Sequence, residues 1–207
     1  MKNHYDFKDY VTLSRWDSYY EQINAVLALK PVNILEIGLG TKLVYAVLKD
    51  MGFQVIGFDN DPQLEPDFLG DITKLDDFFK EGQFDCVCCF QVLEHLPFSE
   101  FENTIKKICK ISSKYVLISL PYAGFGVGME IFCARRGEKR LSFDFRIPKL
   151  WVKHRYIGMH HWEPGYHGYS LRKIKKILLN HFEIKQIKFS IPSKTGIMFI
   201  LKKKYDK

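Results

Sequence analysis

The residues that decide the fold are Asn33-Ile34-Leu35-Glu36-Ile37-Gly38-Leu39-Gly40-Thr41, an apolar run that ends in two closely spaced glycines. Such a run predicts a buried parallel strand whose tip turns sharply, so that bare backbone can approach a ligand where the next helix begins. The next apolar run, Val55-Ile56-Gly57-Phe58-Asp59, ends in a carboxylate. An acidic side chain at a neighbouring strand tip can accept hydrogen bonds from a ribose. Together the two runs predict a site for a nucleoside-bearing cofactor.

The glycine pattern departs from the fingerprint of dinucleotide-binding proteins. The third glycine of G-x-G-x-x-G would fall at Leu43, whose side chain would obstruct close packing of the helix on the strand. Glu36 lies two residues before the first glycine and suits a ligand with a cationic or amino group better than a diphosphate. The pattern Glu-x-Gly-x-Gly resembles motif I of the class I methyltransferases that depend on S-adenosylmethionine (SAM).

The resemblance continues over residues 32–121 in the order and spacing of that family. Gly70-Asp71-Ile72 resembles the segment after the family's third strand, where the adenine amine is met and an apolar residue covers the ring. Phe84–Leu96, with its Leu-Glu-His-Leu ending, is similar to the fourth strand and the loop after it, and Lys114–Pro121 is similar to the fifth strand. The resemblance implies an α/β fold, a Rossmann-like, seven-stranded, mostly parallel sheet flanked by helices, with SAM as the cofactor.

The strand tips and the resemblance together predict a set of cofactor-binding residues, which are Glu36, Gly38, Gly40, Asp59, Asn60, Asp71, Ile72, Gln91 and His95. For His95 the resemblance implies a positioning role near the cofactor rather than direct catalysis. Lys42 stands where the family often has a third motif I glycine. This departure supports a different class of function, a non-catalytic module that binds the cofactor or another protein.

The composition fits one globular domain over residues 1–207, because 207 residues with 46% hydrophobic content can bury a sizeable core. Nothing at the start resembles a signal peptide, and no stretch approaches the roughly 20 apolar residues of a membrane span. The number of cysteines is odd, five, and three of them lie on one predicted buried strand. We therefore expect reduced thiols and a cytoplasmic location.

The net charge of +7 conceals a division between the two halves of the chain. Residues 1–104 contain 8 basic and 18 acidic side chains, whereas residues 105–207 contain 23 basic and 6 acidic ones. A half with a charge of +17 attracts anions, which include acidic small molecules, phosphorylated or acidic glycans, nucleic acids and anionic membrane surfaces. The alternative is that many of these lysines, such as Lys173, only solvate an exposed helix face.

Apolar strands alternate with helical segments, which predicts a parallel sheet covered on both sides. The predicted strands are 32–38, 54–59, 67–70, 84–90, 114–120, 182–191 and 196–203, and the predicted helices are 14–29, 41–51, 74–80, 99–111 and 170–179. Ser14 is the expected cap of the first helix. The segment Arg15–Tyr20 could cover the cofactor as a lid, or Trp16 and Tyr20 could anchor the helix to the domain.

The alternation breaks after Pro121, where residues 122–168 combine glycines, arginines and aromatic residues. This segment is too long for a connector and too aromatic for a disordered one, so we interpret it as a substrate-facing insertion after the fifth strand. On this division, residues 1–31 form an N-terminal helical cap, residues 32–121 the cofactor-binding core, and residues 169–207 a C-terminal helix and strand pair.

The candidate chemistry lies in His160-His161-Trp162-Glu163. Methyl transfer from a sulfonium is an in-line displacement, so the enzyme aligns the acceptor and, for a hydroxyl, removes its proton. Histidine titrates in the range that this task requires. We predict His161 as the base and Glu163 as its orienting carboxylate, with His160 as the close alternative.

The other interpretation of this segment is structural: His160 and Glu163 make hydrogen bonds while Trp162 packs in the core. A metal is not expected, because the spacing of His160, His161 and His167 matches no familiar set of ligands.

These features predict an enzyme, a SAM-dependent methyltransferase that acts on a small-molecule or glycan-like acceptor at oxygen, and an anionic acceptor would suit the basic half. An RNA methyltransferase is the alternative enzyme. Against nucleic acid as the partner, the fourth strand leads into Gln91-Val92-Leu93-Glu94 rather than the Asn/Asp-Pro-Pro-aromatic motif of exocyclic amine methylation, and the chain has no Pro-Cys pair.

Overall fold

The computed structural model of the protein describes residues 10, 12–132, 140–156, 158–189 and 196–204. A seven-stranded sheet has the strand order β3-β2-β1-β4-β5-β9-β8, in which β9 alone is antiparallel to both of its neighbours and the pairs from β3 to β5 are parallel. This is the predicted Rossmann-like, mostly parallel sheet. Its strands are β1 (Asn33–Ile37), β2 (Gln54–Asp59), β3 (Phe68–Leu69), β4 (Phe84–Phe90), β5 (Ser112–Pro121), β8 (Phe182–Phe189) and β9 (Gly196–Lys203).

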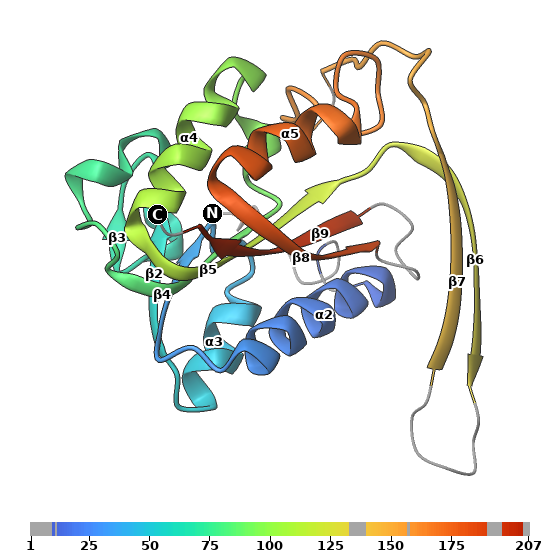
Figure 1. Cartoon of the computed structure of the whole chain (residues 1–207). Coiled ribbons are helices and arrows are strands. Elements are labelled where there is room, and N and C mark those ends of the chain that lie inside the picture. Colours follow the sequence, from blue (N-terminus) through green and yellow to red (C-terminus); the bar gives the residue numbers. More distant parts are fainter. Residues whose placement is uncertain (1–9, 11, 133–139, 157, 190–195, 205–207) are drawn as a thin grey trace.

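Helices cover both faces of this sheet (Figure 1). One face packs against α4 (Phe98–Ile111) and α5 (Leu171–His181), and the other packs against α2 (Leu13–Leu29) and α3 (Leu43–Asp50). Because side chains alternate along a strand, Val87 and Cys89 of β4 join the first core, while Cys86 and Cys88 join the second. Burial on both faces explains the continuous apolar runs of the central strands.

Three local expectations differ from the structure. The first helix begins at Leu13, and its N-cap is Thr12 rather than Ser14, since the Thr12 side chain accepts a hydrogen bond from the Arg15 amide. Trp16 and Tyr20 are 51% and 53% exposed, so the anchoring role considered for them is wrong. Residues 74–80 do not form a regular helix, because the chain there forms the 3-10 turn η2 (Ile72–Asp77). Two further 3-10 turns are η1 (Pro62–Leu64) and η3 (Leu93–His95).

The described cysteines are all reduced and buried, as predicted; they are Cys86, Cys88, Cys89 and Cys109. Cys133 lies outside the described residues. Among the helices that the structure describes, none is long and apolar enough to cross a membrane.

The insertion contains a two-stranded antiparallel ribbon that the sequence analysis did not predict, formed by β6 (Gly124–Phe132) and β7 (Arg140–Pro148). Figure 1 shows it as a long arm at the edge of the molecule. Its side chains alternate between two faces, and Phe125, Val127 and Met129 lie opposite Ile147, Phe145 and Phe143. This apolar face is open, with exposed fractions from 46% at Ile147 to 76% at Val127.

Candidate active site

The loop after β1 is built from left-handed backbone conformations at alternate positions. Gly38, Gly40 and Lys42 have φ angles of 81°, 49° and 59°. A Cβ atom on Gly38 would lie 2.2 Å from a methyl carbon of Val92, so only glycine fits where this loop meets the loop after β4. Lys42 therefore has a left-handed backbone conformation, which glycine adopts at least cost. This conformation explains why the family that the sequence resembles often has glycine at this position. Lys42 is also the N-cap residue of α3.

Glu36 lies on β1 directly before this loop and is 3% exposed. Its Oε2 atom has no hydrogen-bond partner among the described residues. Burial raises the pKa of Glu36 to about 8, because the carboxylate form is poorly solvated there. A buried carboxyl with an unpartnered oxygen beside a glycine loop can receive an amino or cationic group, and the residues present therefore fit a cofactor with an α-amino group.

We expect the free energy of unfolding to fall as the pH rises from 4.5 towards 8, by up to about 1.4 kcal/mol per pH unit from Glu36 alone. The folded state keeps a proton on Glu36 that the unfolded state releases in this window, so rising pH favours unfolding. Glu36→Gln has a similar shape and no titrating proton, and its slope should be flatter. Urea denaturation across this pH range measures both slopes, and identical slopes would contradict this role of Glu36.

Asp59 at the end of β2 ties two loops together. Its Oδ2 atom accepts a hydrogen bond from the Leu39 amide at 2.7 Å, and its Oδ1 atom accepts one from the Asp61 amide at 2.9 Å. Each carboxylate oxygen retains a further lone pair. Asp59 therefore holds the glycine loop in place, a role that the sequence analysis did not predict. The ribose contact expected from the sequence would be a second role.

The other predicted cofactor-binding residues also follow strand tips. Asn60 is exposed, Asp71 caps η2 by accepting hydrogen bonds from Thr73, and Ile72 is 7% exposed. After β4, the Gln91 side chain donates to the Ser119 hydroxyl at 3.3 Å. His95 lies in η3 with Nδ1 at 3.2 Å from the Met159 carbonyl, and burial lowers its pKa.

The segment with the paired histidines is fixed at two points. The fully buried Trp162 donates a hydrogen bond from its indole nitrogen to the Leu96 carbonyl at 3.0 Å, next to α4. The Pro164 carbonyl accepts from the Ala123 amide at 2.8 Å, and a Cβ atom on Gly165 would lie 2.0 Å from the Ala123 oxygen. The segment is therefore held between α4 and the end of β5.

The structure pairs Glu163 with His160, not with His161. The Nδ1 atom of His160 lies 2.7 Å from Oε1 of Glu163, and this contact raises the pKa of His160. The i,i+3 spacing places both side chains on one side of the turn that Trp162 anchors. His161 donates its backbone amide to the Glu94 carbonyl, and its exposed ring packs against Tyr156.

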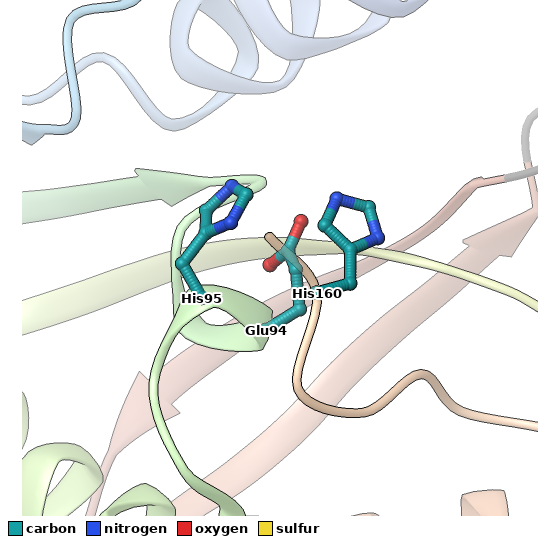
Figure 2. A group of neighbouring side chains, drawn as sticks. All are labelled: Glu94, His95 and His160. Carbon is teal, nitrogen blue, oxygen red and sulfur yellow. The ribbon is translucent and has the colours of Figure 1, made fainter. Parts of the chain in front are cut away.

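His160 also meets the residues after β4, as Figure 2 shows. The rings of His95 and His160 lie edge to face with centroids 5.0 Å apart, and Glu94 lies between these side chains. Glu94 is fully buried, burial raises its pKa to about 8, and neither carboxyl oxygen has a partner among the described residues. One ligand atom from each of the three lies within 4.8 Å of the others, so this group could hold a metal ion. It differs from the three histidines considered from the sequence, because His167 instead lies near the Leu150 carbonyl.

A cavity of about 510 Å³ opens beside the His160–Glu163 pair. It lies between α2, the ends of β5 and β8, the start of β9 and the insertion. Its charged and polar walls include Arg15, Gln91, Lys149, His160, Glu163 and Lys188. Arg15, Lys149 and Lys188 were not predicted as site residues from the sequence, because only the fold brings α2, the end of the ribbon and β8 together. Gln91 joins the cavity to the strand tips with the predicted cofactor-binding residues.

Solved structures of several methyltransferases are similar to this fold. NodS, an N-methyltransferase from Bradyrhizobium japonicum WM9 in complex with S-adenosyl-L-homocysteine, is 12% identical with a TM-score of 0.61, over 98% of this chain and 93% of that chain. A SAM-dependent methyltransferase from Archaeoglobus fulgidus is 13% identical with a TM-score of 0.62, over 95% and 97%. Magnesium protoporphyrin IX methyltransferase from Synechocystis PCC 6803, with bound SAM, is 15% identical with a TM-score of 0.60, over 99% and 86%.

The sequence comparisons give the family. No curated protein matches the chain. Residues 14–178, which are most of the chain, match the family described as a methyltransferase domain. This match spans the glycine loop, the strand tips and the His160–Glu163 pair. The chain therefore belongs to the methyltransferase domain family and is a class I methyltransferase that uses S-adenosylmethionine.

Proposed function

We propose that the protein transfers the methyl group of SAM to a hydroxyl oxygen of a small-molecule or glycan-like acceptor. The observation that supports this proposal is the His160–Glu163 pair in the cavity wall, with its 2.7 Å contact. With Glu163 at Nδ1, the neutral imidazole carries its proton there and leaves Nε2 free to accept one. A base held in one tautomer by a carboxylate suits the removal of a hydroxyl proton.

The bound cofactor supplies a methyl group on a positively charged sulfur. His160 would take the acceptor's proton at Nε2 as the hydroxyl oxygen accepts this methyl group, for which the cofactor would supply a neutral thioether as the leaving group. The imidazolium that forms is stabilised by Glu163. The cavity walls hold the acceptor in line, and alignment supplies much of the rate in such a displacement.

In our proposal, different segments of the chain bind the cofactor, enclose the acceptor and complete the sheet. The cofactor is held at the strand tips by Glu36, Gly38, Gly40, Asp59, Asn60, Asp71, Ile72, Gln91 and His95. Residues 1–31 and 122–168 close the acceptor cavity over this core of residues 32–121, and residues 169–207 complete the sheet. This division is supported by the cavity, whose walls come from α2 and from both ends of the insertion. The reduced thiols support a cytoplasmic location.

The test is methyl transfer to matched acceptors. Purified protein is incubated with SAM and either methyl glucoside, which offers hydroxyls, or glucosamine, which adds an amine, and the formation of S-adenosylhomocysteine is measured. We expect turnover with methyl glucoside, whose hydroxyls are its only nucleophiles. An amine acceptor is the second candidate, since NodS is named an N-methyltransferase. Turnover only when an amine is present would replace oxygen by nitrogen as the methylated atom.

We expect Asp59→Ala to weaken the binding of S-adenosylhomocysteine by roughly tenfold to over a hundredfold, the cost of a lost hydrogen bond to a charged group. The variant should also lose about 1 to 3 kcal/mol of stability, because the Leu39 amide loses its acceptor. Calorimetric titration and urea denaturation measure the two effects. Asp61→Ala is the matched control, since the Asp61 side chain caps η1. An unchanged affinity in folded Asp59→Ala would remove Asp59 from the site.

A further inference from the structure

The charged side chains of the cavity wall are not balanced. Lys188 is neutralised by Glu21, with Nζ 3.2 Å from Oε2, and Glu163 is engaged by His160. Arg15 and Lys149 also line the cavity, and neither forms an ion pair with a carboxylate of the described residues. With His160 neutral, three cations (Arg15, Lys149 and Lys188) line the cavity with two carboxylates (Glu21 and Glu163), and Arg15 and Lys149 are the cations without a carboxylate partner among the described residues.

Both of these cations are held in place by aromatic rings. The guanidinium carbon of Arg15 lies 4.4 Å from the centre of the Tyr10 ring, and Nζ of Lys149 lies 4.8 Å from the centre of the Phe125 ring. A cation–π contact orients the charged group and leaves N–H donors available for an acceptor. The two side chains are thus positioned without their hydrogen-bonding capacity being used.

The two cations share one site with the proposed base. Arg15 is near enough to His160 to act against its protonation by charge repulsion, and both side chains face the same cavity. Lys149 follows β7 and comes from the insertion, whereas Arg15 comes from α2. An acceptor in the cavity would therefore contact one cation from α2 and one from the insertion.

We propose that Arg15 and Lys149 form an anion subsite, so that the acceptor is a hydroxyl compound that carries a phosphate or a carboxylate. The forked guanidinium of Arg15 suits either group, because it can donate two parallel hydrogen bonds to a pair of anionic oxygens. The basic second half of the chain attracts the same class of ligand at longer range. The substrate class rests on the proposed function, whereas anion binding by Arg15 and Lys149 does not.

Calorimetric titration of the full chain with glucose 6-phosphate, glucuronate and glucose tests the subsite. We expect one or both anions to bind at least about tenfold more tightly than glucose, and Arg15→Gln or Lys149→Gln to remove about tenfold or more of this preference. Lys173→Gln is the matched control, because Lys173 is also stacked on a ring, that of Phe98, but lies outside the cavity. Tighter binding of glucose 6-phosphate would identify a phosphate as the anionic group, and tighter binding of glucuronate would identify a carboxylate.

Several outcomes would overturn the subsite: equal affinity for glucose and both anions, an equal loss in Lys173→Gln, or generic RNA that binds through Arg15 and Lys149 more tightly than either anion at moderate salt. Failure of the proposed function is distinguishable. Anion binding without methyl transfer to oxygen would contradict the function and leave the subsite in place. Methyl transfer with the same KM in wild type and Arg15→Gln would leave the function and contradict the subsite.

Discussion

His160→Ala is expected to lower kcat by about 10² to 10⁴, the usual contribution of a general base, while the affinity for SAM stays nearly constant. His160 faces the cavity, and its Nδ1 atom is taken by Glu163 at 2.7 Å. Without the imidazole the acceptor stays aligned, but no base removes the proton of its hydroxyl group. Steady-state kinetics with calorimetry of S-adenosylhomocysteine separates the loss of turnover from any loss of cofactor binding.

His161→Ala is the matched control, because His161 is the adjacent histidine, is exposed, and packs its ring against Tyr156 rather than in the cavity wall. Its kcat should stay within about twofold of wild type. A large loss in His161→Ala together with a small one in His160→Ala would restore the assignment first made from the sequence. Equal, small losses in both would mean that alignment alone drives the transfer.

The pH dependence of kcat adds a readout that a purely structural role would not change. A base works in its deprotonated form, so kcat should rise with pH through the pKa of His160. Glu163 raises this pKa, mainly through the hydrogen bond to Nδ1. Glu163→Gln removes that contribution, and the midpoint of the profile should therefore move to lower pH. An unmoved midpoint would contradict the pairing of His160 with Glu163.

The core of the fold could be predicted from the sequence because its signals are local. The apolar runs that end at Ile37, Asp59 and Phe90 are buried on both faces, and such strands read as continuous runs. Their order along the chain, with intervening helices, is enough to predict a parallel sheet. The strand tips then follow from the topology, which is why the predicted cofactor-binding residues lie at one edge.

The ribbon escaped prediction although its alternating pattern is present. Phe125, Val127 and Met129 alternate with glycines, which depress strand propensity, and an apolar face open to solvent is not what alternation normally indicates. The helix predicted at 74–80 failed for the opposite reason. The signals there were local, but the turn that begins at the Asp71 cap decided the backbone.

The candidate site was predicted only in part, because it depends on contacts between distant residues. The choice between His160 and His161 rests on which of them turns towards Glu163 when Trp162 enters the core, and residue spacing does not determine this. Arg15 and Lys149 meet at the cavity only after α2 and the insertion have packed over the sheet. Interactions of this kind belong to tertiary structure.

Trp162→Ala is expected to destabilise the protein by about 3 to 5 kcal/mol, the usual cost of removing a large side chain from a packed core. Trp162 is the largest fully buried side chain, and its ring packs edge to face against Phe98 and Phe101 with centroids 4.9 and 5.0 Å away. Its indole nitrogen also donates to the Leu96 carbonyl. In a chain of this size the loss corresponds to a fall in Tm of roughly 6 to 20 °C.

The same substitution should also lower kcat, since Trp162 fixes the turn that pairs His160 with Glu163. Thermal unfolding and kinetics below the lowered Tm measure the two effects. Trp151→Ala is the matched control: Trp151 lies in the same insertion but is 67% exposed, so its Tm and kcat should change little. Trp162→Phe retains most of the packing and loses the bond to Leu96, and should cost about 1 to 3 kcal/mol. A Tm for Trp162→Ala within about 2 °C of wild type would show that this segment is not anchored in the core, and the positions of both proposed catalytic side chains would then lack their support.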